Sequence, residues 1–134
     1  MHRVTDPLVF VGRVLLSFIF VKEGVDAIGH YSDVAGYMQS NGVSARLLPF
    51  VILAQLGGGL SVLTGFLARL GAIALAGFCL LTAVMFHGNW ADFNEAIQFQ
   101  KDFCMAGGFL VLAAFGPGLW SLDAWLGRRG WPLL

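Results

Sequence analysis

Residues 8–29 read LVFVGRVLLSFIFVKEGVDAIG, an apolar stretch long enough to cross a lipid bilayer as a helix, which takes roughly 20 residues. Four charged side chains interrupt it: Arg13, Lys22, Glu23 and Asp26. Charge inside a membrane span costs free energy, so such residues usually face a partner, a cavity or a functional site. This stretch therefore predicts a membrane-embedded helix that also carries candidate functional groups.

The composition of the 134-residue chain indicates a membrane protein. Hydrophobic residues make up 57% of it and charged residues only 12%, and the mean hydropathy is +0.76. A soluble protein of this size would leave too much apolar surface in water. The formal net charge is zero and no basic patch is evident, so nothing favours a nucleic-acid partner.

Four apolar stretches predict an all-α integral membrane protein, a compact bundle of four transmembrane helices that forms a single domain over residues 1–134. The expected helices cover about 8–29, 47–66, 70–86 and 103–125. Pro7 suits the start of the first helix because its missing N–H would be unpaired there. Gly116-Pro117-Gly118 is expected to break or kink the fourth helix near its end.

An even number of spans places both termini on one side of the membrane. The positive-inside rule makes that side the cytoplasm, because it holds more basic residues (Arg3, Arg69, Arg128 and Arg129) than the other side does (Arg46 and Lys101). The long connections 30–46 and 87–101 then face outward. A cleaved signal peptide is the alternative for the N-terminus. Arg13 interrupts its apolar region and no small-x-small site follows, so the first helix is expected to be retained.

An ordered set of motifs over nearly the whole chain resembles the DoxX family of four-span bacterial membrane proteins. The motifs are Arg13 ten residues before the glutamate of Phe20-Val21-Lys22-Glu23-Gly24, Gln55 with Gly58-Gly59, Leu63-Thr64-Gly65-Phe66 leading to Arg69, Phe86-His87 with Trp90, Lys101-Asp102, and FGPGLWSLD over 115–123. The family takes its name from small subunits of archaeal thiosulfate:quinone oxidoreductase. The resemblance therefore implies a bacterial cytoplasmic (inner) membrane protein associated with an oxidoreductase, and it implies the fold more firmly than the reaction.

The chain departs from this family's usual pattern at three positions. It has Gln55 where a glutamate is usual, Ala27 where a lysine is usual, and Asp102 where an asparagine is common. Acidic residues stand instead at Glu23 and Asp26, one helical turn apart and able to share a face. Gln55 does not titrate, so it can hydrogen-bond a neighbour or a ligand carbonyl but cannot carry a proton.

Two residues are the candidates for proton transfer to a quinone, Glu23 in the first helix and His87 at the outer end of the third. Four more are candidates for binding or orienting the ligand: Arg13, Gln55, Lys101 and Asp102. Structural readings stay open for several of them. Arg13 can be a topology anchor or half of an intrabundle ion pair, Lys22 can pair with Asp26 at i, i+4, and Lys101 and Asp102 can serve the start of the fourth helix.

Metal binding is the competing use of the outer acidic and histidine residues, but they lack a recognisable ligand spacing, so we predict no metal site. These residues are His30, His87, Asp92, Glu95 and Asp102. Cys79 and Cys104 are expected at different membrane depths, which makes a disulfide unfavourable.

The leading hypothesis is a membrane subunit of a quinone-linked oxidoreductase, with a pocket for quinone or another small ligand near the outer membrane face. The chain carries no motif for a covalently bound redox centre, so it needs a redox protein partner to form a complete enzyme. A homo-oligomer is compatible with this hypothesis. The alternative is a non-enzymatic membrane anchor or assembly factor, and a small-solute or metal carrier is a third reading without inverted repeats to support it.

Overall fold

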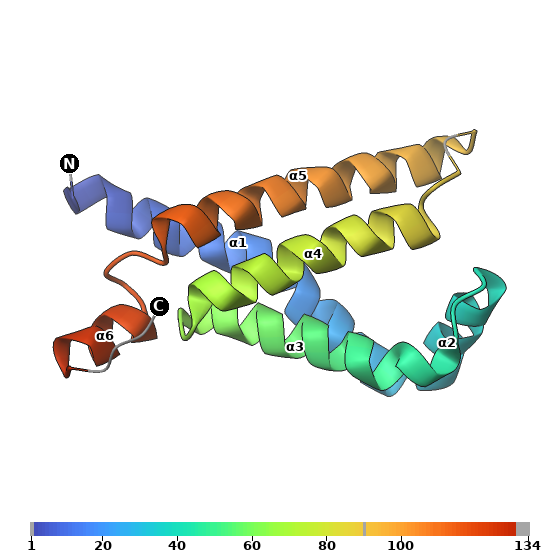
Figure 1. The fold of residues 1–134 in the computed structure, drawn as a ribbon, viewed down its shortest axis with the longest axis horizontal. Coiled ribbons are helices and arrows are strands. Elements are labelled where there is room, and N and C mark those ends of the chain that lie inside the picture. Colours follow the sequence, from blue (N-terminus) through green and yellow to red (C-terminus); the bar gives the residue numbers. More distant parts are fainter. Residues whose placement is uncertain (1, 90, 131–134) are drawn as a thin grey trace.

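The computed structural model describes residues 2–89 and 91–130, which form helices joined by short connections (Figure 1); Trp90 of the motif set lies outside the described residues. The elements are α1 (His2–Gly29), α2 (Tyr31–Ser40), the 3-10 helix η1 (Ala45–Leu47), α3 (Leu48–Thr64), α4 (Ala68–Phe86), α5 (Phe93–Phe115) and α6 (Leu122–Arg128).

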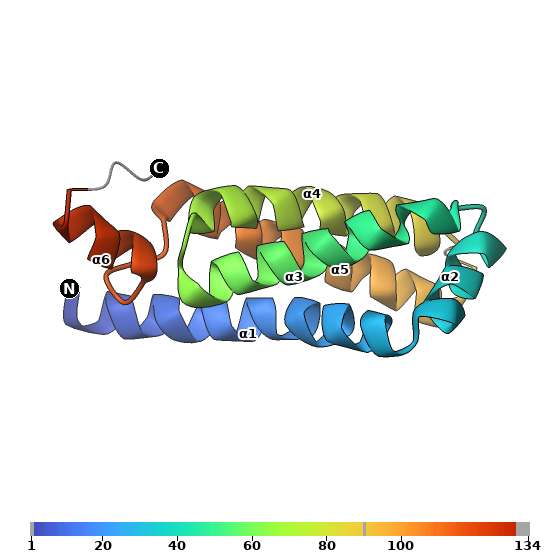
Figure 2. The same ribbon diagram turned by 90° about the horizontal axis from the view of Figure 1, so that it is seen from below.

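The four long helices form an elongated bundle with two distinct ends (Figures 1 and 2). The start of α1 and the short α6 lie at one end, here called the α6 end. The α2 helix and the connection from α4 to α5 lie at the other, here called the α2 end. Charged groups at the two ends are therefore far apart in space.

The long helices pack in the order α1, α3, α4, α5, and each packs mainly against its neighbour in this series. By contrast, α1 and α5 share few contacts and diverge toward the α2 end (Figure 1). Small residues on α4, including Ala72 and Ala76, let the neighbouring backbones approach closely. The α1 and α5 backbones are thus farther apart at the α2 end than the neighbouring pairs that include α3 and α4.

Two buried clusters hold the helices together. The larger cluster joins α1, α3, α4 and α5, and the Phe20 and Phe109 rings meet edge to face there with centroids 5.4 Å apart. A smaller one at the α2 end gathers Met38, Val43 and Leu48. Because these residues lie beside the connection at 41–47, the smaller cluster folds α2 back against the bundle.

Two helical stretches of the described chain are long and apolar enough to cross a membrane by length and composition, Ala45–Thr64 and Ala68–Phe86. The second and third predicted ranges overlap α3 and α4 closely. The first predicted range ends with α1 at Gly29, but α1 begins at His2, so Pro7 lies inside this helix and not at its start. The fourth differs, because α5 runs over Phe93–Phe115 and not over 103–125. The first turns of α5 are polar, so hydropathy does not include them in the predicted span. They are helical because the Asp92 side chain caps them by accepting the N–H groups of Asn94 and Glu95.

The end of α5 lies at the expected breaker. Gly116 has a φ of +85°, which a residue with a side chain rarely adopts, and Pro117 follows it. The chain then turns, and α6 forms a separate short helix whose N-cap is Ser121. The α2 helix lies within the stretch that the sequence left as a connection, because its polar composition gives no span signal.

Candidate functional site

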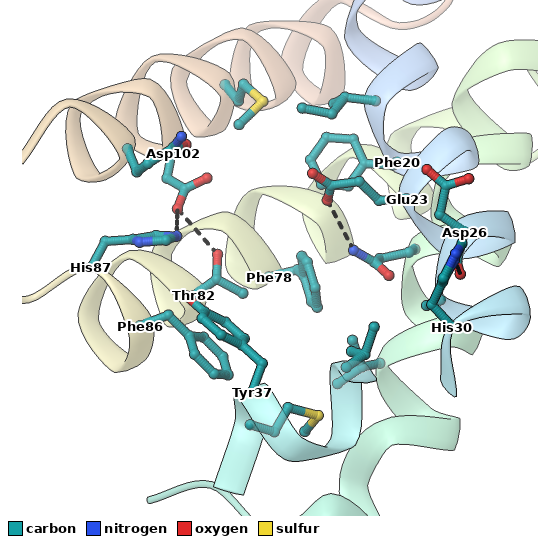
Figure 3. A pocket seen from close by; sticks show the side chains of 18 residues that line it. Phe20, Glu23, Asp26, His30, Tyr37, Phe78, Thr82, Phe86, His87 and Asp102 are labelled. Carbon is teal, nitrogen blue, oxygen red and sulfur yellow. Dashed lines mark hydrogen bonds and ion pairs between the residues drawn. The ribbon is translucent and has the colours of Figure 1, made fainter. Parts of the chain in front are cut away.

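A cavity of about 480 Å³ lies between the helices at the α2 end (Figure 3). All five of the helices α1 to α5 line it. Its walls combine aromatic and sulfur-containing side chains with polar and titratable ones: Phe20, Phe78, Phe86, Tyr37, Met38 and Met105, together with Glu23, Asp26, His30, Gln55, Thr82, His87, Gln98 and Asp102. This volume is within the usual range for a small-molecule site.

Glu23 and Gln55 form one polar group on the cavity wall. The Gln55 amide Nε2 donates a hydrogen bond to Glu23 Oε2 at 3.2 Å, so α1 and α3 are joined across the cavity wall (Figure 3). Gln55 is buried, whereas Glu23 remains accessible along the cavity. The amide can therefore fix the carboxyl in position without competing with it for protons.

His87 and Asp102 form a second polar group on the opposite side of the cavity, from α4 and α5 (Figure 3). The distance from His87 Nε2 to Asp102 Oδ2 is 4.0 Å, and the Thr82 hydroxyl donates to Asp102 Oδ2 at 3.3 Å. On its other face, His87 Nδ1 lies 2.7 Å from Glu95 Oε2. His87 thus stands between two carboxylates.

Aromatic side chains separate the two polar groups. The Phe86 ring stacks on Tyr37, with centroids 5.6 Å apart and planes inclined by 16°, and Phe20 meets Phe78 edge to face at 6.2 Å. Burial, and secondarily the nearby Glu95 charge, raise the pKa of the Tyr37 hydroxyl. Tyr37 therefore stays a neutral hydrogen-bonding group at neutral pH.

Arg13 lies outside this cavity, toward the α6 end. Ten residues separate it from Glu23, which is about 15 Å along a helix. Its side chain is buried and donates to the Trp120 carbonyl, while its Nε and Nη1 have no hydrogen-bond partner in the described part of the chain. The guanidinium packs so tightly on Gly65 that a Cβ there would lie 2.3 Å from Nη1.

The FGPGLWSLD segment closes the α6 end through backbone groups. Asp123, buried, accepts the N–H of Leu67 at 2.7 Å and that of Ala68 at 2.9 Å, at the start of α4. Asp6 Oδ1 accepts the N–H of Leu119 at 3.0 Å. This motif, which the sequence placed inside the fourth predicted span, therefore lies beyond the end of α5 and is the structural closure of the bundle.

The structure brings together four of the six predicted site residues, Glu23, Gln55, His87 and Asp102, in one cavity. Arg13 and Lys101 do not line it; Lys101 is exposed on α5. The three departures from the family pattern, at Ala27, Gln55 and Asp102, all lie on the cavity wall.

The sequence did not single out Thr82 or Tyr37, and it considered Glu95 only as a metal ligand. Thr82 stands five residues before His87, a spacing that turns the two side chains about 140° apart on a helix, so no sequence signal pointed to it. Tyr37 joins the cavity only because α2 folds back, which no local pattern indicates.

Two other features of the described residues bear on the chemistry. The expected Lys22–Asp26 pair forms, with Lys22 Nζ 2.6 Å from Asp26 Oδ2 on the exposed side of α1. Cys79 and Cys104 are both free, the first buried and the second exposed. No cluster of three or more histidine, cysteine or acidic side chains suited to a metal ion occurs within residues 2–89 and 91–130.

The sequence matches a known protein family and is similar to several known membrane proteins. The DoxX family model matches residues 8–88. The chain is similar to inner membrane protein YqjF of Escherichia coli, with 42% identity covering 96% of this chain and 99% of the relative, and to inner membrane protein YphA of the same organism, with 30% identity over 87% and 88%. An uncharacterized membrane protein of Mycobacterium tuberculosis, Rv3486, is 28% identical over 96% and 87%. No solved structure matches the chain.

Proposed function

Because the chain belongs to the DoxX family, we propose that it is a membrane subunit of a quinone-linked oxidoreductase whose cavity at the α2 end holds a quinone or a related lipid-soluble ligand. The protein resides in the bacterial cytoplasmic membrane, and its family is associated with membrane subunits of oxidoreductases. The observation that carries the proposal is the cavity itself, an aromatic chamber with a polar group on each side.

In the proposed topology α1, α3, α4 and α5 each cross the membrane. The α6 end, with Arg69, Arg128 and Arg129, then faces the cytoplasm, and the α2 end faces outward. The cavity would lie at the outer side of the bilayer, within reach of both lipid and the outer aqueous phase. A fusion of a cytoplasm-specific fluorescent reporter to the C-terminus tests this orientation.

The shape of the cavity suits a flat ring with polar oxygens at opposite edges. Phe20, Phe78 and Phe86 offer apolar and aromatic contact for the ring. Gln55 with Glu23 on one side, and His87 with Asp102 on the other, offer hydrogen bonds to its oxygens.

Access for such a ligand is lateral. The α1 and α5 helices share few contacts and diverge at the α2 end, and both contribute lining residues, among them Ile19 and Met105. A ligand dissolved in the bilayer can reach the polar groups between these helices without crossing the aqueous phase. The space between α1 and α5 at the α2 end would thus be the path by which the ligand enters the cavity.

When bound, a quinone accepts two electrons and two protons, and the electrons come from a redox protein partner. Glu23 supplies a proton to one ring oxygen, and Gln55 holds the Glu23 carboxyl in place for that transfer. His87 supplies a proton to the opposite oxygen, next to Asp102. In this scheme Arg13 holds the α6 end of the bundle, and Lys101 lies on the outer surface where a partner can dock.

Quinone binding is tested with the purified full chain in lipid nanodiscs, using decylubiquinone as the probe. Glu23→Gln and His87→Ala are expected to weaken binding or quinone-linked turnover at least tenfold. Asp33→Asn is the control, because Asp33 is an exposed acidic residue of α2 outside the cavity. If Glu23→Gln and His87→Ala assembled normally and matched the control, the quinone-site proposal would be wrong.

A membrane anchor or assembly factor is the second candidate, and the α6 end favours it. There the buried charges of Arg13 and Asp123 contact backbone groups of the closing segment, which is a purely structural use of charge. On this reading the native complex contains a partner protein but no quinone by mass spectrometry. The partner's activity would also survive loss of both Glu23 and His87.

A further inference from the structure

His87 has a carboxylate at each ring nitrogen, and only one of the two belongs to the cavity. Its Nδ1 lies 2.7 Å from Glu95 Oε2, and its Nε2 lies 4.0 Å from Asp102 Oδ2. His87 and Asp102 line the cavity, whereas Glu95 does not. We infer that Glu95, His87 and Asp102 form a proton relay that connects the outer aqueous phase to the cavity; this inference rests on the proposed function of that cavity.

The exposure of the three side chains gives the relay its direction. Glu95 is 32% exposed, His87 20% and Asp102 13%. Each step inward therefore moves from a better hydrated group to a less hydrated one. Glu95 exchanges protons with water at the outer end, and Asp102 delivers them beside the ligand.

The helices α4 and α5 bring the three relay side chains next to one another. Glu95 and Asp102 are seven residues apart on α5, which is about two helical turns, so both side chains lie on the face toward α4. Asp92 caps α5 and fixes where that face begins. His87 ends α4 and reaches across between the two carboxylates.

The relay moves one proton without a net change in the imidazole. A protonated Glu95 gives its proton to Nδ1 while the Nε2–H proton passes to Asp102, and the neutral ring then returns to its starting tautomer. The 4.0 Å gap to Asp102 exceeds a hydrogen bond. It closes by rotation of the Asp102 carboxylate away from the Thr82 hydroxyl, or through one water molecule.

The groups around the relay come from each helix packed at this end. Tyr37 of α2 lies near Glu95, and Glu23 of α1 lies across the cavity, close enough to interact electrostatically with His87 and Asp102. Glu95 differs from Glu23 in having no contact with the cavity. Its removal should therefore affect proton delivery and leave ligand binding intact.

One test needs no quinone. Nitrogen-15 NMR of histidine-labelled protein in nanodiscs reports the tautomer of His87, and a His87→Asn variant identifies its signals. Glu95→Gln is expected to change the His87 tautomer populations, and Glu95→Asp to restore part of the wild-type distribution. Asp33→Asn, an exposed acidic residue on α2, is the matched control and should leave these populations unchanged. Unchanged His87 signals in Glu95→Gln would overturn the relay.

The second test measures proton uptake from the medium with a pH-indicating dye when bound decylubiquinone is chemically reduced. Glu95→Gln is expected to slow uptake at least tenfold and to keep binding within about twofold of wild type. Uptake as fast as in Asp33→Asn would overturn the relay while leaving the quinone site standing. If the wild-type protein binds no decylubiquinone, the proposed function fails, and the NMR result alone decides whether His87 couples to Glu95.

Discussion

Replacing Asp123 by alanine should destabilise the protein more than any other single loss of a helix cap. In the folded chain each carboxylate oxygen of Asp123 accepts one backbone N–H at the start of α4, from Leu67 at 2.7 Å and from Ala68 at 2.9 Å. The carboxylate is buried. Leu67 also holds a left-handed conformation, with a φ of +50°, that this contact supports.

The size of the effect follows from the two N–H groups left without an acceptor. A buried donor that loses its partner costs about 1–3 kcal/mol, and a carboxylate near the positive end of a helix adds about 0.3–1 kcal/mol. Two donors and the dipole term together predict a loss of about 2–7 kcal/mol for Asp123→Ala. Asp123→Asn keeps one acceptor oxygen and should fall between this variant and wild type.

The assay is the free energy of unfolding in mixed detergent micelles, measured for the two Asp123 variants and a control. Asp92→Ala is the matched control, since Asp92 also caps a long helix through its side chain but is exposed. Water replaces the lost acceptor there, so we expect a cost of about 1 kcal/mol or less. A loss for Asp123→Ala no larger than for Asp92→Ala would refute the reasoning from burial.

Three further predictions use neighbouring or paired residues. Gly58→Ala should lower the free energy of unfolding by about 1–3 kcal/mol, because a Cβ there would lie 2.8 Å from the buried Leu75 side chain on α4. A Cβ at Gly57 would meet open space, so Gly57→Ala should be neutral or slightly stabilising in the same assay. Gly65→Ala should cost at least as much as Gly58→Ala, since it adds strain at a φ of +77° to a clash with a guanidinium, and equal stability with Gly57→Ala would contradict this. N-ethylmaleimide should modify Cys104 and leave Cys79 unmodified in the folded protein, as mass spectrometry of intact chains can check; rapid labelling of both would contradict the buried position of Cys79.

Hydropathy located three of the long helices well because their apolar residues run almost without interruption. It misplaced the start of α5, because hydrogen bonding along a helix continues through polar turns that hydropathy excludes. Asp92 is an N-cap aspartate whose side chain accepts the N–H groups of Asn94 and Glu95, and it marks the true start. Giving that local signal more weight than apolar length would have moved the boundary ten residues toward the N-terminus.

The sequence predicted cavity-lining residues only where a suitable side chain also lay at the same membrane depth as the cavity. Glu23 and His87 were chosen as titratable groups near the same membrane face, and they do line one cavity. Arg13 is a candidate for its charge inside a span and its place in the family motif set, but its position along α1 places it toward the α6 end and outside the cavity. Lys101 is next to Asp102, but successive helical residues point about 100° apart, so one faces the cavity and the other faces outward.

The closure of the α6 end sets an order for biosynthesis. A ribosome makes the chain from its N-terminus, yet Asp6 finds its donor at Leu119, 113 residues later, and Arg13 finds its acceptor at Trp120, 107 residues later. The backbone N–H groups of Leu67 and Ala68 at the start of α4 likewise lack their acceptor until Asp123 has been made. The polar groups of α1 therefore lack these partners until the segment after α5 has been made, and a chain terminated before Leu119 carries an uncompensated guanidinium that distinguishes it from the folded protein.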